Sequence, residues 1–224
     1  TTEIYTLSLH DALPIFSFAR RVERGDDRRQ LFLHVLKRAL ILYALGIFLN
    51  LAPEFHFAQV RLVGVLPRIA VCYLAASAIF LTTRLRGQIL WCAGLAAAYS
   101  VLMLLVPVPG GVAGSFTKEM NMERYLDSLF LTGHMWSHTK YWDPEGFVST
   151  LPSICTVLFG IFAGHLLRTA RTQAEKAAWL FTGGLAAMAL GAFLDNWFMP
   201  INKNLWTIPF ALFMAGISAC GFGL

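Results

Sequence analysis

The residues best suited to chemistry stand where apolar stretches of the sequence give way to polar ones. The clearest case is Asp143-Pro-Glu-Gly, which leads into an apolar run that closes at Arg168. We expect Asp143 to cap a helix, Pro144 to occupy its first turn, and Glu145 to lie at the positive end of the helix dipole. This stretch therefore predicts a membrane helix whose N-terminal end is polar.

A cation stands inside another apolar run. Arg68, in Val-Gly-Val-Leu-Pro-Arg-Ile, is costly there unless it is paired or its head group reaches the interface. Snorkelling is one outcome, and a buried partner is the other, for which Asp143 and Glu145 are the best candidates ahead of Asp195. Asp127, Asp143 and Glu145 could also form a glycosidase-type carboxylate pair, but capping and ion pairing explain them more simply.

Two histidines follow in the segment before this helix. His134 and His138 are four residues apart, so on a helix they would share a face and could chelate a metal. No glutamate of the HExxH type lies between them, and no third ligand is apparent. We therefore assign no metal site.

Polar groups also gather in the connections between apolar runs. After Asp195, the connection holds Asn202, Lys203 and Asn204, which either are ordinary loop residues or line a polar cavity. On the opposite side, a basic group could receive phosphates: His165, Arg168, Arg171, Arg84 and Arg86. The rule that cytoplasmic loops of membrane proteins are basic also accounts for most of these arginines.

The elements that position these residues are apolar helices. Of 224 residues, 57% are hydrophobic and only 14% are charged, which indicates an all-α, polytopic membrane bundle. Six runs have nearly the length of about 20 residues that a bilayer core demands. They are Val35–Leu51, Leu62–Thr83, Gln88–Val106, Asp143–Arg168, Trp179–Leu194 and Leu205–Leu224.

The basic residues set the orientation of these spans. The Arg-rich stretch 20–38 precedes the first span, and we expect it in the cytoplasm together with the connections 84–88 and 168–176. The net charge of +5 is spread over such short connections instead of one patch, which argues against a nucleic-acid partner. The four cysteines lie in apolar runs without CxxC spacing and are expected to be buried and unpaired.

Small residues predict where the helices pack closely. Gly160 and Gly164 form one stripe at helical spacing, and Gly183, Ala187 and Gly191 form a second. Such stripes let two helix backbones approach each other within a membrane.

The two ends of the sequence differ from the rest. Residues 1–16, Thr-Thr-Glu-Ile-Tyr-Thr-Leu-Ser-Leu-His-Asp-Ala-Leu-Pro-Ile-Phe, resemble translated sequencing-adapter read-through and are expected to be non-native. Residues 17–224 are then a partial transmembrane domain. Because the last apolar run reaches Leu224 without a terminal charge or cap, we expect truncation at both ends.

Three ordered motifs resemble the heparan-alpha-glucosaminide N-acetyltransferase family and its bacterial homologues. They are Gly64-Val-Leu-Pro-Arg-Ile-Ala-Val-Cys-Tyr73, Asp143 to Pro152, and Pro200-Ile-Asn-Lys-Asn-Leu-Trp206. The segment from Glu123 to His134 is similar to the family's outer loop. The resemblance implies transfer of an acetyl group from cytoplasmic acetyl-CoA to an amino sugar across the membrane, here the bacterial inner membrane.

The resemblance also implies roles for residues. We assign Arg68, His165 and Arg168 to acetyl-CoA, the co-substrate. The substrate-side candidates are His134, Asp143, Glu145, Asn202, Lys203 and Asn204. The family's acetyl-transfer histidine lies in a segment absent from this chain, so no catalytic residue is assigned and the fragment itself is expected to be inactive. The expected partners are the lipid bilayer, acetyl-CoA and a glycan acceptor, with self-association as one option.

Two other function classes compete with this interpretation. A small-solute transporter or permease component would use Arg68, Asp195 and a helix kinked at Pro152 as a midplane site. The sequence shows no repeat between its halves, which argues against a transporter. A structural membrane subunit is the third class, and only the clustered intramembrane charges argue against it.

Overall fold

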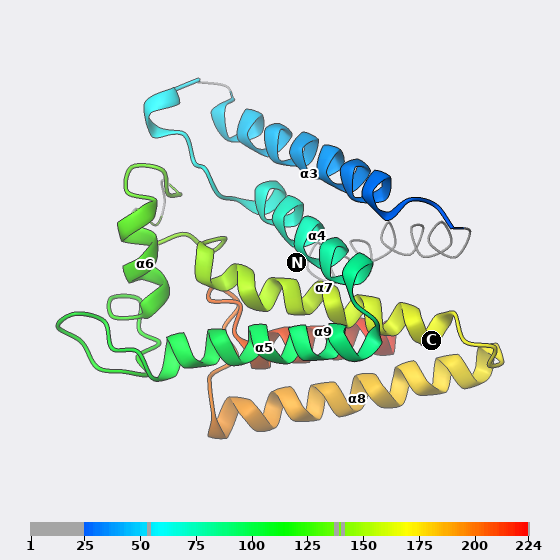
Figure 1. Cartoon of the computed structure of the whole chain (residues 1–224). Helices are drawn as coiled ribbons and strands as arrows, with labels where there is room; N and C mark the ends of the chain where they lie inside the picture. Colours follow the sequence, from blue (N-terminus) through cyan, green and yellow to red (C-terminus); the bar gives the residue numbers. More distant parts are fainter. Residues whose placement is uncertain (1–24, 53–54, 137–138, 140–141, 224) are drawn as a thin grey trace.

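The computed structural model describes residues 25–52, 55–136, 139 and 142–223, and within these ranges all regular structure is helical (Figure 1). The predicted non-native segment 1–16 lies outside the described residues. The helices, in chain order, are α3 (Arg28–Leu51), the short 3-10 helix η1 (Phe57–Gln59), α4 (Val65–Thr82), α5 (Leu85–Leu104), α6 (Met122–Phe130), α7 (Phe147–Leu167), α8 (Gln173–Trp197) and α9 (Ile208–Phe222).

Five of the described helices are long and apolar enough to cross a membrane, namely α3, α4, α5, α7 and α8. The sixth predicted span corresponds to α9, which is apolar but only 15 residues long. The expected all-α polytopic membrane bundle is confirmed.

The first span begins earlier than the sequence predicted. Instead of starting at Val35, α3 starts at Arg28, because the side chain of Asp27 accepts the backbone N–H of Arg29 at 2.9 Å and caps the helix. Arginine, lysine and glutamine are good helix formers, so the basic stretch continues the helix instead of ending it.

Helix α7 is the central helix of the bundle. It contacts α4, α5, α6, α8 and α9. Within its most apolar stretch of 18 residues, 67% is buried, whereas the corresponding value for α8 is 17%. One core cluster joins α7 to α3 and α4 through Leu31, Tyr73 and Leu158, and a second joins it to α5 and α6 through Tyr99 and Val148. Helices α3, α5 and α8 are much less buried and lie toward the outside of the bundle.

The cysteines behave as small hydrophobic residues. Cys72, Cys92 and Cys155 are buried and Cys220 is half-buried, and none of the four forms a disulfide. The Sγ atom of Cys155 lies 3.5 Å from the carbonyl oxygen of Cys92, which ties α7 to α5. The prediction of buried, unpaired thiols is confirmed for the first three.

The polar connections separate into two ends. The start of α3, the α4–α5 connection and the α7–α8 connection lie at one end of the bundle, to the right in Figure 1, while η1, α6 and the α8–α9 connection lie at the other. We call these the basic end and the acidic end. The described parts of all three segments predicted to be cytoplasmic are therefore on the same side of the bundle, with residues 20–24 outside the described part of the chain.

Helices α8 and α9 pack closely through glycines. An added Cβ at Gly184 would lie 2.7 Å from the Sγ atom of Cys220 and the carbonyl oxygen of Gly216, and one at Gly191 would lie 2.9 Å from the carbonyl oxygen of Pro209. An added Cβ at Gly183 would meet nothing within 4 Å. The predicted stripe is thus wrong at its first position, because the α8 face that meets α9 contains Gly184 and not Gly183.

This packing makes a matched pair of substitutions informative. We expect Gly184→Leu to separate α8 from α9 and to lower the midpoint of thermal unfolding in detergent, with a cost of about 2 kcal/mol for overpacking. The neighbouring Gly183→Leu has open space around it and should leave the midpoint unchanged. Equal midpoints for the two variants, measured by tryptophan fluorescence, would contradict the described packing.

Candidate functional site

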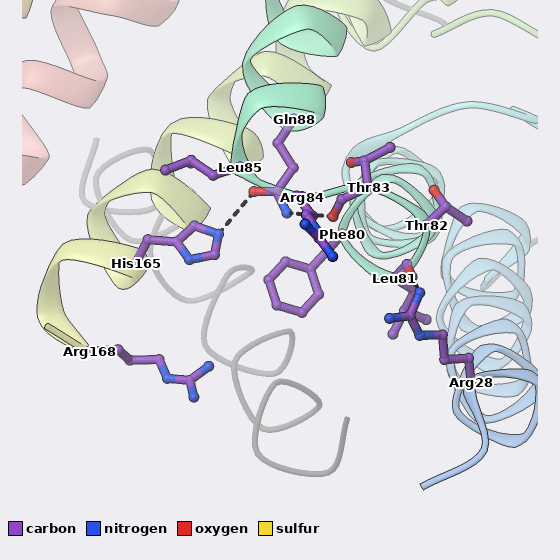
Figure 2. Close-up of a pocket in the computed structure, with 10 residues that line it drawn as sticks. All are labelled: Arg28, Phe80, Leu81, Thr82, Thr83, Arg84, Leu85, Gln88, His165 and Arg168. Carbon is purple, nitrogen blue, oxygen red and sulfur yellow. Dashed lines mark hydrogen bonds between the residues drawn. The ribbon is translucent and has the colours of Figure 1, made fainter. Parts of the chain in front are cut away.

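A cavity of about 770 Å³ opens at the basic end of the bundle (Figure 2). The end of α4, the start of α5 and the last turn of α7 form its walls, and Arg28 and Arg168 approach it from opposite sides. The lining residues are Arg28, Phe80, Leu81, Thr82, Thr83, Arg84, Leu85, Gln88, His165 and Arg168. Three guanidinium groups and one imidazole therefore share one cavity.

Helix termini place the cationic side chains. Only two residues, Thr83 and Arg84, separate α4 from α5, so the ends of both helices lie at the cavity. The Nη1 atom of Arg28 donates to the carbonyl oxygen of Leu81 at 3.1 Å. The last carbonyls of a helix have no partner within the helix and carry partial negative charge, which explains why a cation is held there.

The imidazole is oriented by a buried amide. Gln88 donates from Nε2 to the carbonyl oxygen of Thr83 at 3.3 Å, so its Oε1 atom faces Nε2 of His165 at 2.9 Å. Because that oxygen can only accept, Nε2 of His165 must carry a hydrogen. In the neutral ring, Nδ1 is then the basic nitrogen. The ring of Phe80, whose centroid is 5.9 Å away, packs beside the imidazole.

This arrangement suits a ligand that carries phosphates. Guanidinium groups bind phosphate oxygens in a bidentate manner, and the cavity has the size of a typical small-molecule site. The structure brings together the predicted residues His165 and Arg168 and adds Arg28 and Gln88, which the sequence analysis missed. Arg171 was considered with them, but its guanidinium lies 5.1 Å from the ring of Trp179, outside the lining.

The acidic end holds an ion-pair network built around Arg61. The Nε atom of Arg61 donates to Oδ2 of Asp143 at 2.7 Å, and Nη2 bonds both to Oδ1 of Asp143 and to Glu145. Burial alone would lower the pKa of Arg61, but the hydrogen bonds and charges of the two carboxylates outweigh it, so that the pKa is raised. The buried carboxylate of Asp143 also accepts the backbone N–H of Trp136 at 3.0 Å.

Asp143 does not cap α7 as predicted. The helix begins at Phe147, and the carboxylate of Asp127 accepts the backbone N–H groups of Phe147 and Asp143 at 3.3 and 3.1 Å. An added Cβ at Gly146 would collide with both carboxylate oxygens of Asp127, so only glycine permits this approach. Burial raises the pKa of Asp127 to about 6, although the two N–H groups oppose the shift.

The predicted ion pair of Arg68 is wrong. Arg61 occupies both proposed partners, and among the described residues no acidic group forms a salt bridge with Arg68. The guanidinium is 4.7 Å from the ring centroid of Trp206, within the protein, so it does not snorkel either. Arg68 lies about 21 Å along α4 from Thr82 at the basic cavity, apart from His165 and Arg168.

Sequence reasoning did not single out Glu123, which is fully buried. Neither of its carboxylate oxygens has a hydrogen-bond partner among the described residues, and burial holds its pKa well above the usual range. The nearby hydroxyl of Ser149 donates to the carbonyl oxygen of Gly146 instead. The available signal was the pattern of α6, where Glu123 and Asp127 share a face with apolar Met122 and Leu126.

The other predicted substrate-side residues mainly build loops. His134 lies in a turn and not on a helix, and its Nδ1 atom is 2.7 Å from the carbonyl oxygen of Val60. His138 lies outside the described residues. Asn202 accepts the backbone N–H groups of Asn204 and Leu205, while the side chains of Lys203 and Asn204 are exposed.

Comparisons with known proteins agree with the sequence motifs. Heparan-alpha-glucosaminide N-acetyltransferase of Homo sapiens is 27% identical over an alignment 243 positions long, gaps included, which covers 84% of this chain and 36% of the human protein. The Mus musculus protein of the same name is 26% identical, with 84% and 37% covered. The chain thus spans little more than a third of the length of these relatives. No protein-family model matches the chain.

The network around Arg61 predicts a specific energetic coupling. Arg61→Gln leaves the buried carboxylate of Asp143 without its cation, which should destabilise the fold by about 3 kcal/mol. Adding Asp143→Asn to that variant should then cost little more, because the uncompensated charge is gone. Chemical unfolding of both variants in detergent checks this, with exposed Lys203→Gln as the control. Additive effects of Arg61→Gln and Asp143→Asn would contradict the coupling.

Proposed function

Because this chain is a homologue of the heparan-alpha-glucosaminide N-acetyltransferases, we propose that it forms part of a membrane acetyltransferase that uses acetyl-CoA and acetylates an amino sugar. The transfer would run from the basic end of the bundle to the acidic end. The observation that carries the proposal is the basic cavity lined by Arg28, Arg84, His165 and Arg168.

The basic cavity is the proposed donor site. Coenzyme A carries a diphosphate and a 3′-phosphate, and the three arginines supply planar donors for such groups. Nε2 of His165, held by Gln88, presents the imidazole in one orientation. In this role the side chains bind and position the nucleotide part of the donor. The residue that transfers the acetyl group is not assigned to this chain.

The orientation of the bundle follows from the same arginines. Basic connections favour the cytoplasmic side, where acetyl-CoA is found, so the basic end would face the cytoplasm of a bacterial inner membrane. The acidic end would then face the other side. Carboxylates at that end suit an acceptor that carries an amine and hydroxyl groups, such as an amino sugar or glycan.

A transporter is less well supported than a transferase. That alternative needs Asp195 in a midplane site, yet its side chain is exposed in the last turn of α8, where Oδ1 accepts the backbone N–H of Ile201 at 2.6 Å. The residue therefore ties the end of α8 to the following connection, at one end of the bundle. Both curated relatives described above are named as transferases.

Binding of coenzyme A tests the proposed donor site. We expect Arg168→Gln to weaken binding by about tenfold, since one charged hydrogen bond contributes about 1.5 kcal/mol or more. Arg171→Gln is the matched control, because Arg171 is three residues away and outside the cavity. Isothermal titration calorimetry of the unmodified chain and of the two variants, with coenzyme A and with 3′-dephospho-coenzyme A, measures these affinities. Equal affinities of the two variants for coenzyme A would contradict the site.

A further inference from the structure

Two buried ionisable groups at the acidic end have polar atoms without a hydrogen-bond partner in the described part of the chain. Arg68 has 6% of its surface exposed, and its Nε and Nη2 atoms have no hydrogen-bond partner among the described residues. Glu123 is fully buried with both oxygens unsatisfied. Leaving such groups unpaired in the interior costs several kcal/mol, so an arrangement of this kind points to a ligand.

The surroundings of Arg68 hold its guanidinium in place. It lies over the indole of Trp206, whose Nε1 donates to Oγ1 of Thr156 at 3.2 Å and whose ring packs edge-on against Phe210 at 5.2 Å. The backbone of Trp206 has φ of 48°, a strained value for a non-glycine residue. Such strain is found most often at functional sites.

Glu123 and Arg68 lie on either side of one packed cluster. Met122, which precedes Glu123, and Leu205, which precedes Trp206, belong to the same buried core cluster, and Arg68 lies over the ring of Trp206. The positive charge of Arg68 lowers the pKa of Glu123, although burial raises it by more and the carboxylates of Asp127 and Asp143 add to the rise. No salt bridge joins Arg68 and Glu123. A polar ligand with both an oxygen acceptor and a hydrogen-bond donor could therefore bridge the two side chains.

The local charge decides what kind of ligand fits. Arg61 is satisfied by Asp143 and Glu145, which leaves Arg68 facing two further carboxyl groups, those of Glu123 and Asp127. A polyhydroxy compound with one amino group matches the excess of carboxyl groups, because the amine can meet a carboxylate while a hydroxyl oxygen accepts from the guanidinium.

We propose that Arg68 and Glu123 form the binding subsite for the amino-sugar acceptor, with Glu123 receiving the amino group and Arg68 donating to a neighbouring hydroxyl. The inference rests on the proposed function and moves Arg68 from the donor to the acceptor. Helix α6 separates this subsite from an outer groove of about 490 Å³, which Arg124 and Ser128 line from its other face. The sugar would reach Glu123 from this groove by displacing α6.

Equilibrium dialysis of the purified chain in detergent tests the subsite with radiolabelled D-glucosamine. Glu123→Gln and Arg68→Lys should each weaken binding at least tenfold, because each removes one of the two bridging contacts. Asp195→Asn, which changes an exposed acid at the same end, should not alter binding. D-glucose, which lacks the amine, should compete poorly with glucosamine for the unmodified chain.

Stability separates a binding role from a structural one. Glu123→Gln keeps the size and shape of the side chain, and its unfolding midpoint reports whether the variant is folded. Loss of glucosamine binding at an unchanged midpoint supports a binding role. Unchanged affinity of a folded Glu123→Gln variant, or an unmodified chain that does not bind glucosamine, would overturn the subsite.

Binding of 3′,5′-ADP separates this inference from the donor site. We expect Glu123→Gln to retain 3′,5′-ADP binding at the basic cavity. If the chain binds glucosamine through Glu123 but binds neither 3′,5′-ADP nor coenzyme A, the donor assignment fails and the subsite stands. If it binds 3′,5′-ADP but glucosamine binding is insensitive to Glu123, the subsite fails alone.

Discussion

The start of α7 depends on one carboxylate from another helix. Asp127 of α6 accepts the N–H of Phe147 and the N–H of Asp143, and Gly146 leaves the space that this approach needs. With the turn fixed in this way, Asp143 and Glu145 face Arg61, from the segment that leads into α4. A single buried acid therefore links α6, α7 and α4, and it sets the position of the most buried helix of the bundle.

The same helix connects the two polar ends. Its last turn presents His165 to the basic cavity, while Ser149 in its first turn lies beside Glu123. Within the helix, the hydroxyl of Thr156 donates to the carbonyl oxygen of Pro152 one turn earlier at 3.1 Å. In the proposed transferase, α7 would thus connect the donor and acceptor subsites at opposite ends of the bundle.

Hydropathy and arginine placement were enough to predict the long apolar helices and the common side of the basic connections, but not the short helix α6. They could not predict that Asp143 pairs with Arg61, which is 82 residues away, because both Arg61 and Arg68 precede α7 at similar separations. The prediction that Asp143 caps α7 was wrong for the same reason. Asp127, which accepts the N–H groups at the start of α7, is distant in sequence and comes near them only in the folded chain. Glu123 escaped notice because a buried, unpaired acid has no sequence signature beyond its place on an apolar face.

The central claim is that the basic end and the acidic end of the bundle face opposite sides of a membrane. Single cysteines at position 171, near the cavity, and at position 203, in the exposed α8–α9 connection, would report it in intact cells with a membrane-impermeant thiol reagent. The native cysteines are at least half-buried, and the unmodified chain supplies the background. The account predicts labelling from outside at 203 and protection at 171. Labelling at both positions, or at 171 alone, would contradict it.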